Sequence, residues 1–124
     1  MKLFTVSEAN DLIPVFRPRL ERLARLYSRL QDLGESARAA AAASESGGGM
    51  PGGTAYVQTI YGISEVVAEL SDAGIQIKDH GRGLIDFPSM REGRIVLLCW
   101  QLGERDEIEF WHETEAGFAG RQPL

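Results

Sequence analysis

The chain has 124 residues, of which 44% are apolar and 25% are charged, and its formal net charge is −5. These values are typical of one ordinary domain over 1–124, and the acidic balance argues against a general nucleic-acid-binding surface. The sequence has no apolar run of about 18 residues and no signal-peptide pattern, so we expect a cytoplasmic protein with no membrane partner.

A helix is predicted to begin close to residue 6. Thr5 and Glu8 have the spacing of a capping box, in which each side chain bonds the backbone amide of the other residue. Pro14 is expected to kink or break this helix, because proline has no amide hydrogen and clashes with the carbonyl four residues earlier. We therefore predict a short helix over 6–13 and a long one from about 15 to 43.

Two helical segments carry apolar seams with the four-three spacing of a coiled coil. The seam residues are Phe16, Leu20, Leu23, Tyr27 and Leu30 in the first segment, and Tyr56, Ile60, Ile63, Val67 and Leu70 in the second, over 54–73. Seams joined by a loop bury each other, which predicts an antiparallel helical hairpin over 5–73. The segment 44–53 between them has five glycines in ten residues and is predicted to be a flexible linker.

Charge is unevenly distributed along the chain. Residues 16–29 contain five arginines and one glutamate, whereas residues 104–115 contain six carboxylates and one arginine. Two solvated faces explain this pattern simply. The alternative is that the opposite charges steer a partner or draw two copies together.

From residue 75 onward the apolar residues alternate, which predicts strands. Four strands are expected, over 75–79, 84–87, 94–101 and 107–112, and Pro88 is expected to end the second. Their short connections imply an antiparallel meander. The predicted fold class is therefore α+β, with the helical hairpin packed on a four-stranded antiparallel β-meander and a C-terminal strap within 75–124.

The last two predicted strands are expected to pair through a turn at 103–106. If that turn places Leu102 opposite Glu107, then Cys99 lies opposite Phe110 and Leu97 lies opposite His112. Alternation along the last strand puts Ile108, Phe110 and His112 on one face, and this face is expected to pack on the helices.

The other face of these strands is also apolar. It carries Val96, Leu98, Trp100 and Trp111. Monomers seldom expose such a patch. We therefore expect either the tail over 114–124 or a second copy of the chain to cover it, and a homodimer is the preferred interpretation.

Four polar residues of the terminal third form the candidate site: Asp86, His112, Glu113 and Arg121. Imidazole and carboxylate groups suit a divalent ion, so Asp86, His112 and Glu113 are the candidate metal ligands. However, His112 and Glu113 are neighbours on one strand and point to opposite faces, so they share an ion only where the strand ends. A structural role for His112 is the competing interpretation.

Asp86 and Arg121 each have two interpretations as well. Asp86 interrupts an apolar strand and either faces water or is buried and paired, for example with Arg82, Arg94 or Arg121. Arg121 could bind a carboxylate or phosphate in bidentate fashion, or belong to a strap pinned by Phe118. Cys99 has no evident thiolate-stabilising partner, and we interpret it as a small buried residue.

Motifs along the chain resemble those of a known family. They are Phe4-Thr5 with Glu8-Ala9-Asn10 and Pro14, Lys78-Asp79, Gly83-Leu84-Ile85-Asp86-Phe87-Pro88, Leu98-Cys99-Trp100, and Trp111-His112-Glu113 with Gly117-Phe118-Ala119-Gly120-Arg121-Gln122-Pro123. This pattern is similar to the bacterial domain-of-unknown-function family 2203, over the whole chain apart from the glycine-rich linker. The resemblance implies a complete bacterial protein, and it carries over no activity, cofactor or catalytic residue.

Two functions remain open from the sequence. The favoured one is a non-enzymatic, dimeric interaction or scaffold protein that presents its arginine-rich helix or its tryptophan-bearing sheet to another protein. The alternative is a small-ligand or divalent-metal-binding protein, with enzymatic activity left open, whose site is formed by Asp86, His112, Glu113 and Arg121.

Overall fold

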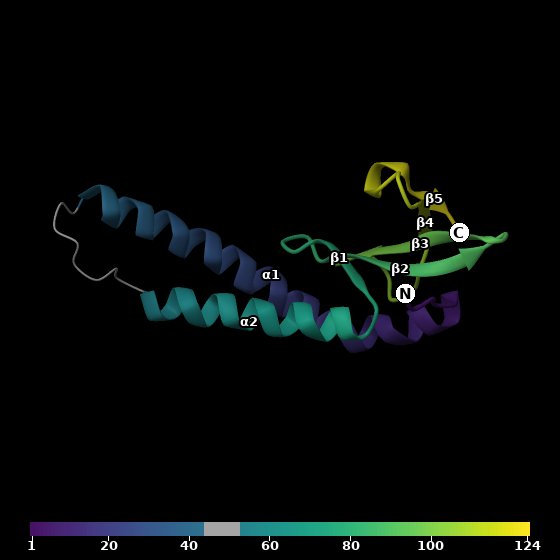
Figure 1. Cartoon of the computed structure of the whole chain (residues 1–124), viewed down its shortest axis with the longest axis horizontal. Coiled ribbons are helices and arrows are strands. Elements are labelled where there is room, and N and C mark those ends of the chain that lie inside the picture. The colour runs from purple at the N-terminus through teal and green to yellow at the C-terminus, as the bar shows by residue number, and fades with distance from the viewer. Residues whose placement is uncertain (44–52) are drawn as a thin grey trace.

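The computed structural model describes residues 1–43 and 53–124 (Figure 1). Two helices, α1 (Val6–Ala43) and α2 (Gly53–Asp72), precede a five-stranded antiparallel sheet. Its strands lie side by side in chain order, and they are β1 (Gln76–Asp79), β2 (Leu84–Arg91), β3 (Arg94–Gln101), β4 (Phe110–Glu113) and β5 (Gln122–Pro123). A short 3-10 helix, η1 (Phe118–Gly120), lies between β4 and β5 in the chain. The α+β class is confirmed, whereas the strand count of four is wrong because the tail supplies a fifth.

The predicted linker over 44–53 falls almost entirely outside the described residues. Within the part of the chain that the structure describes, neither helix has an apolar stretch long enough to cross a bilayer.

The helix α1 begins at the predicted capping box. The Thr5 amide donates to Glu8 Oε1 at 2.9 Å, and the Glu8 amide donates to Thr5 Oγ1 at 3.0 Å. The hydrogen bond from the Thr5 backbone is the main reason that the pKa of Glu8 lies below its ordinary value. The predicted break is wrong, because one helix continues through Pro14 and Pro18. Both prolines are exposed, so water can reach the carbonyls that lose their helical partners.

The two helices pack antiparallel as a hairpin. Arg19 of α1 forms an ion pair with Glu69 of α2, and Leu26, further along α1, contacts Gly62, which is earlier in α2. The predicted seam on α2 is rotated, since Ile60 is 44% exposed. The residues of α2 that are buried are Thr59, Gly62, Val66 and Leu70. A Cβ at Gly62 would lie 3.1 Å from Leu26 Cδ1, so glycine permits this close approach.

Only the part of the hairpin nearest the chain's N-terminal end covers the sheet, and the rest extends beyond it (Figure 1). The shared core contains Ala9, Ile13, Phe16, Leu20 and Leu23 from α1, Val66 and Leu70 from α2, and Ile85, Phe87, Val96, Leu98, Trp100 and Trp111 from the strands. The predicted orientation of the sheet is therefore wrong. The helices cover the tryptophan-bearing face, and the face that carries His112 points away from them.

The pairing of the strands follows the predicted register. Cys99 lies opposite Phe110 and Leu97 opposite His112. The strand β2 does not end at Pro88 but continues to Arg91. The Phe4 amide donates to the Pro88 carbonyl at 2.7 Å on the side away from β3. The proline nitrogen points to that same side, so the ladder to β3 loses no hydrogen bond.

Candidate functional site

The sheet face that points away from the helices carries a buried polar cluster. Asp86 comes from β2, Cys99 from β3 and His112 from β4, and they are 0%, 1% and 2% exposed. Asp86 and Cys99 lie directly opposite each other in the β2–β3 ladder. One carboxylate oxygen, the thiol sulfur and one imidazole nitrogen all lie within 4.8 Å of one another. Three neighbouring strands thus bring together three groups that can each bind a metal.

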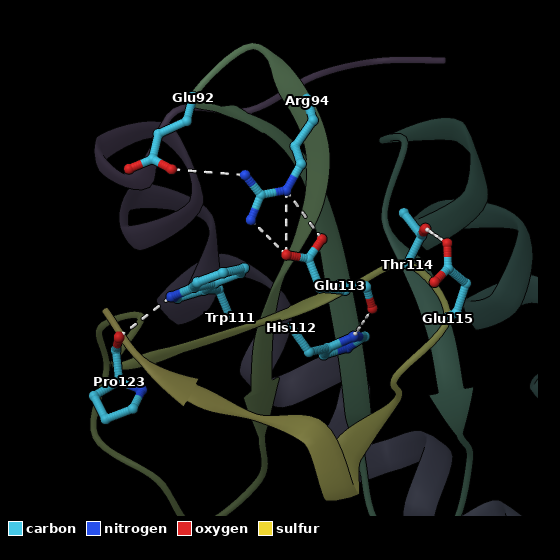
Figure 2. Close-up of polar contacts among 8 residues, drawn as sticks. All are labelled: Glu92, Arg94, Trp111, His112, Glu113, Thr114, Glu115 and Pro123. Atoms are coloured by element: carbon cyan, nitrogen blue, oxygen red, sulfur yellow. Dashed lines mark hydrogen bonds and ion pairs between the residues drawn. The ribbon is translucent and has the colours of Figure 1, made fainter.

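The histidine of this cluster is fixed by two contacts. His112 Nδ1 lies 2.8 Å from the Glu113 carbonyl oxygen (Figure 2), and because a carbonyl only accepts, Nδ1 carries a hydrogen. His112 Nε2 lies 3.1 Å and 3.0 Å from the two carboxylate oxygens of Asp86. A bare nitrogen lone pair would repel a carboxylate, so this contact requires a shared proton or a cation in its place.

Cys99 is the member of the cluster that sequence reasoning did not place. It is buried as predicted, and burial, followed by the charge of Asp86, raises the pKa of its thiol to about 12. At neutral pH the metal-free protein therefore holds a thiol and not a nucleophilic thiolate. The sequence contained a signal for this position, since a turn at Glu92–Gly93 sets the register that pairs Cys99 with Asp86.

A cavity of about 210 Å³ opens above the cluster. The buried residues that line it are Leu84, Asp86, Leu97 and His112, and its exposed rim consists of Lys78, Thr114, Glu115, Gly117 and Phe118. Most of the rim belongs to the segment after β4 that leads into η1. The C-terminal strap, residues 114–124, therefore forms one wall of a space whose floor is Asp86 and His112.

Glu113 does not join the cluster. Arg94 Nε donates to both of its carboxylate oxygens at 3.2 Å, as Figure 2 shows. This hydrogen bonding is the main reason that the pKa of Glu113 is lowered. The expected divergence of neighbouring residues on a strand explains why Glu113 and His112 have different partners.

Arg121 pairs with Glu104 and not with Asp86. It donates from Nη1 to Glu104 Oε2 and from Nη2 to Glu104 Oε1, both at 2.7 Å, and from Nη2 to the Cys99 carbonyl at 3.2 Å. Burial alone would lower the pKa of Arg121, but the bonds to Glu104 contribute to a net rise. The guanidinium also lies 4.8 Å from the ring centre of Phe118. Arg121 thus fixes the strap to the sheet.

Of the four predicted site residues, the structure brings together Asp86 and His112 alone. Asp86 is buried and paired, as the second of its two interpretations predicted, but its partner is His112 and not one of the suggested arginines. Cys99 completes the cluster in place of Glu113 and Arg121.

Comparison with known proteins gives one finding. No curated protein and no solved structure shows a significant match to the chain. The model of the family described as "Uncharacterized conserved protein (DUF2203)" matches residues 2–124. This match confirms the resemblance seen in the sequence motifs, and the chain belongs to the DUF2203 family.

Proposed function

We propose that this protein binds a divalent transition metal through Asp86, Cys99 and His112. The observation that carries the proposal is the meeting of three buried ligand-type atoms within 4.8 Å, from residues of which Asp86 and His112 line a cavity. One imidazole, one thiolate and one carboxylate form a ligand set of the kind that suits Zn²⁺.

The local geometry supports this ligand set. Metal-bound histidines commonly donate their second N–H to a carbonyl, and His112 Nδ1 has such a partner in the Glu113 carbonyl at 2.8 Å. The free Nε2 then faces Asp86, at 3.0 Å from Oδ2. A nitrogen and an oxygen ligand of a tetrahedral zinc ion lie roughly 3.3–3.5 Å apart, so this pair would have to separate by only about 0.3–0.5 Å.

Protonation of Cys99 is the main opposing effect. With its pKa raised to about 12, the thiol must lose a proton before it can bind a metal. A dication stabilises the buried thiolate, because it supplies an opposite charge that the apolar surroundings lack. Metal binding therefore releases protons from the site.

Cobalt substitution tests the proposal. The full chain, purified without chelator, is assayed for bound metal and then titrated with Co²⁺. We expect one equivalent, tetrahedral visible bands and a near-ultraviolet thiolate band that disappears in Cys99→Ser. Asp86→Asn should weaken binding at least about 100-fold, since a ligand is removed. Glu113→Gln is the matched control and should leave the stoichiometry unchanged. Absence of a saturable thiolate band would refute the site.

A dimeric interaction protein is the second candidate function. The face of α2 opposite α1 carries Val57, Ile60 and Tyr61, which are 65%, 44% and 66% exposed. The tryptophan-bearing sheet face that suggested a dimer is covered by the helices, so α2 becomes the surface on which we propose that a second copy packs. Sedimentation should then show a dimer that dissociates in Val57→Glu/Tyr61→Glu, and a strict monomer for the unmodified chain would contradict this.

A further inference from the structure

We infer that the metal at Asp86, Cys99 and His112 keeps one coordination position for a small monocarboxylate that enters the cavity. This inference rests on the proposed metal site. Three protein ligands leave a four-coordinate ion one position short, which is typical of sites that bind an exogenous molecule. Asp86 and His112 line the cavity, whereas Cys99 does not, so an ion among the three is reached from the cavity side.

Charge at the floor of the cavity permits an anion. A dication held by one carboxylate, one thiolate and one neutral imidazole has no net charge, so the loaded site does not repel an anionic ligand. Lys78 at the rim adds a positive charge above it, and Glu115 at the rim adds a negative one. These two side chains should therefore change anion affinity in opposite directions.

The walls of the cavity determine which anion fits. Leu84, Leu97 and Phe118 give it apolar sides around the polar floor. A ligand with a charged head and a short apolar body matches both, whereas a phosphate has no apolar part and needs several donors. The volume of about 210 Å³ equals roughly seven waters at about 30 Å³ each, which is enough for a short-chain acid.

A chain-length series on the Co²⁺-loaded protein tests this inference. Formate, acetate, propionate, butyrate and valerate are titrated while the visible cobalt bands are followed. We expect affinity to rise about fourfold per methylene until the cavity is filled, and then to fall. In Phe118→Ala the gain per methylene should be smaller, because one apolar wall is missing.

Charge variants provide the second arm of the test. Lys78→Gln should weaken butyrate binding about three- to tenfold, and Glu115→Gln should strengthen it by a similar factor. Lys2→Gln is the matched control, because Lys2 is the other lysine of the chain and does not line the cavity. The cobalt spectrum of each variant before titration shows whether its metal site is intact.

The outcomes separate this inference from the proposed function. Bound Co²⁺ whose bands respond to no carboxylate would overturn the inference and leave the metal site standing. The assignment to the cavity would be overturned if the affinity measured from the cobalt bands did not change with chain length or in either rim-charge variant. It would also be overturned if phosphate changed the bands as much as butyrate does. Failure to bind Co²⁺ would refute the metal site and this inference together.

Discussion

The two faces of the sheet both have buried residues at their centres, but these residues differ in chemistry. On the helix-facing side, Val96, Leu98 and Trp100 are 0%, 2% and 1% exposed. On the opposite side, Asp86 and His112 are 0% and 2% exposed. The first face is covered by α1 and α2, and the second by the segment 114–118 that leads into η1, while β5 extends the sheet at its edge (Figure 1).

The difference lies in what each cover can supply. Helices present many large side chains, which fill the space above the sheet and exclude polar groups. The strap is short and is held mainly by the bidentate bonds from Arg121 to Glu104 and by pairing of β5 with β4. It leaves a cavity and a buried polar cluster beneath it. One face therefore stabilises the fold, and the other has the cavity at which we propose that a metal binds.

The largest effect on stability is expected from the helix-facing side. Phe87 is fully buried there and meets Phe4 edge-to-face at a ring distance of 5.3 Å. Phe87→Ala removes these contacts and leaves a cavity, which should lower the free energy of unfolding by about 3–5 kcal/mol. Urea denaturation measures the loss, and Co²⁺ stoichiometry of the remaining folded protein should not change. A loss below about 1 kcal/mol would show that this face is not the main core.

On the opposite face, stability and binding should separate. His112→Leu leaves the Asp86 carboxylate buried without its partner, which should cost about 3–5 kcal/mol in the presence of EDTA. Replacing both residues, in Asp86→Leu/His112→Leu, should recover most of that loss, because a buried pair is often no more stabilising than apolar groups of similar size. Neither variant should bind Co²⁺. Equal stability of the single and double variants would argue against a coupled pair.

The sequence predicted which residues pair across neighbouring strands, but it did not predict which face of the sheet the helices cover. The predicted turn at 103–106 gave the register that puts Leu97 opposite His112, and the structure has that register. The predicted strand start at 107 is wrong, because β4 begins at Phe110 and the pairing with β3 reaches only Cys99. Alternation shows which residues share a face, but both faces of β3 are apolar, so it does not show which face the helices cover. Ile108 also escaped the alternation, because it precedes β4 and its amide donates to Asn10 Oδ1 at 2.6 Å.

The candidate site was only partly predictable for a related reason. Asp86 and His112 lie on the two strands that flank β3, and the register of each strand against β3 places them close together on one face. Glu113 and Arg121 have long side chains that reach partners on other segments, Arg94 and Glu104. Strand alternation shows that Glu113 points away from His112, but it does not identify the partner of Glu113, and the position of Arg121 depends on how the tail folds.

Metal affinity should depend on pH through the ligands of the strap-covered face. At neutral pH the metal-free site holds the Cys99 proton, since burial and the charge of Asp86 raise the pKa of the thiol to about 12. Metal binding releases protons, so affinity should rise with pH, by about tenfold per unit for each proton released. In Cys99→Ser the slope of log affinity against pH should fall by about one. Co²⁺ titrations between pH 6 and about 8 measure it, and equal slopes would exclude Cys99 as a ligand.

The smallest effect is expected where the strap is fastened. Arg121 and Glu104 have side chains only 12% and 22% exposed, so Glu104→Gln weakens a charge-assisted pair in a partly buried setting and should cost about 1–2 kcal/mol. Glu113→Gln is the matched control, because its pair with Arg94 is 36% and 47% exposed and solvent weakens such pairs. Thermal unfolding of both variants should show the larger shift for Glu104→Gln.

The strap should also open more often in Glu104→Gln, so EDTA should remove Co²⁺ from this variant faster than from Glu113→Gln. Equal removal rates would mean that the metal leaves without movement of the strap, and that the cavity wall is closed by β5 pairing alone.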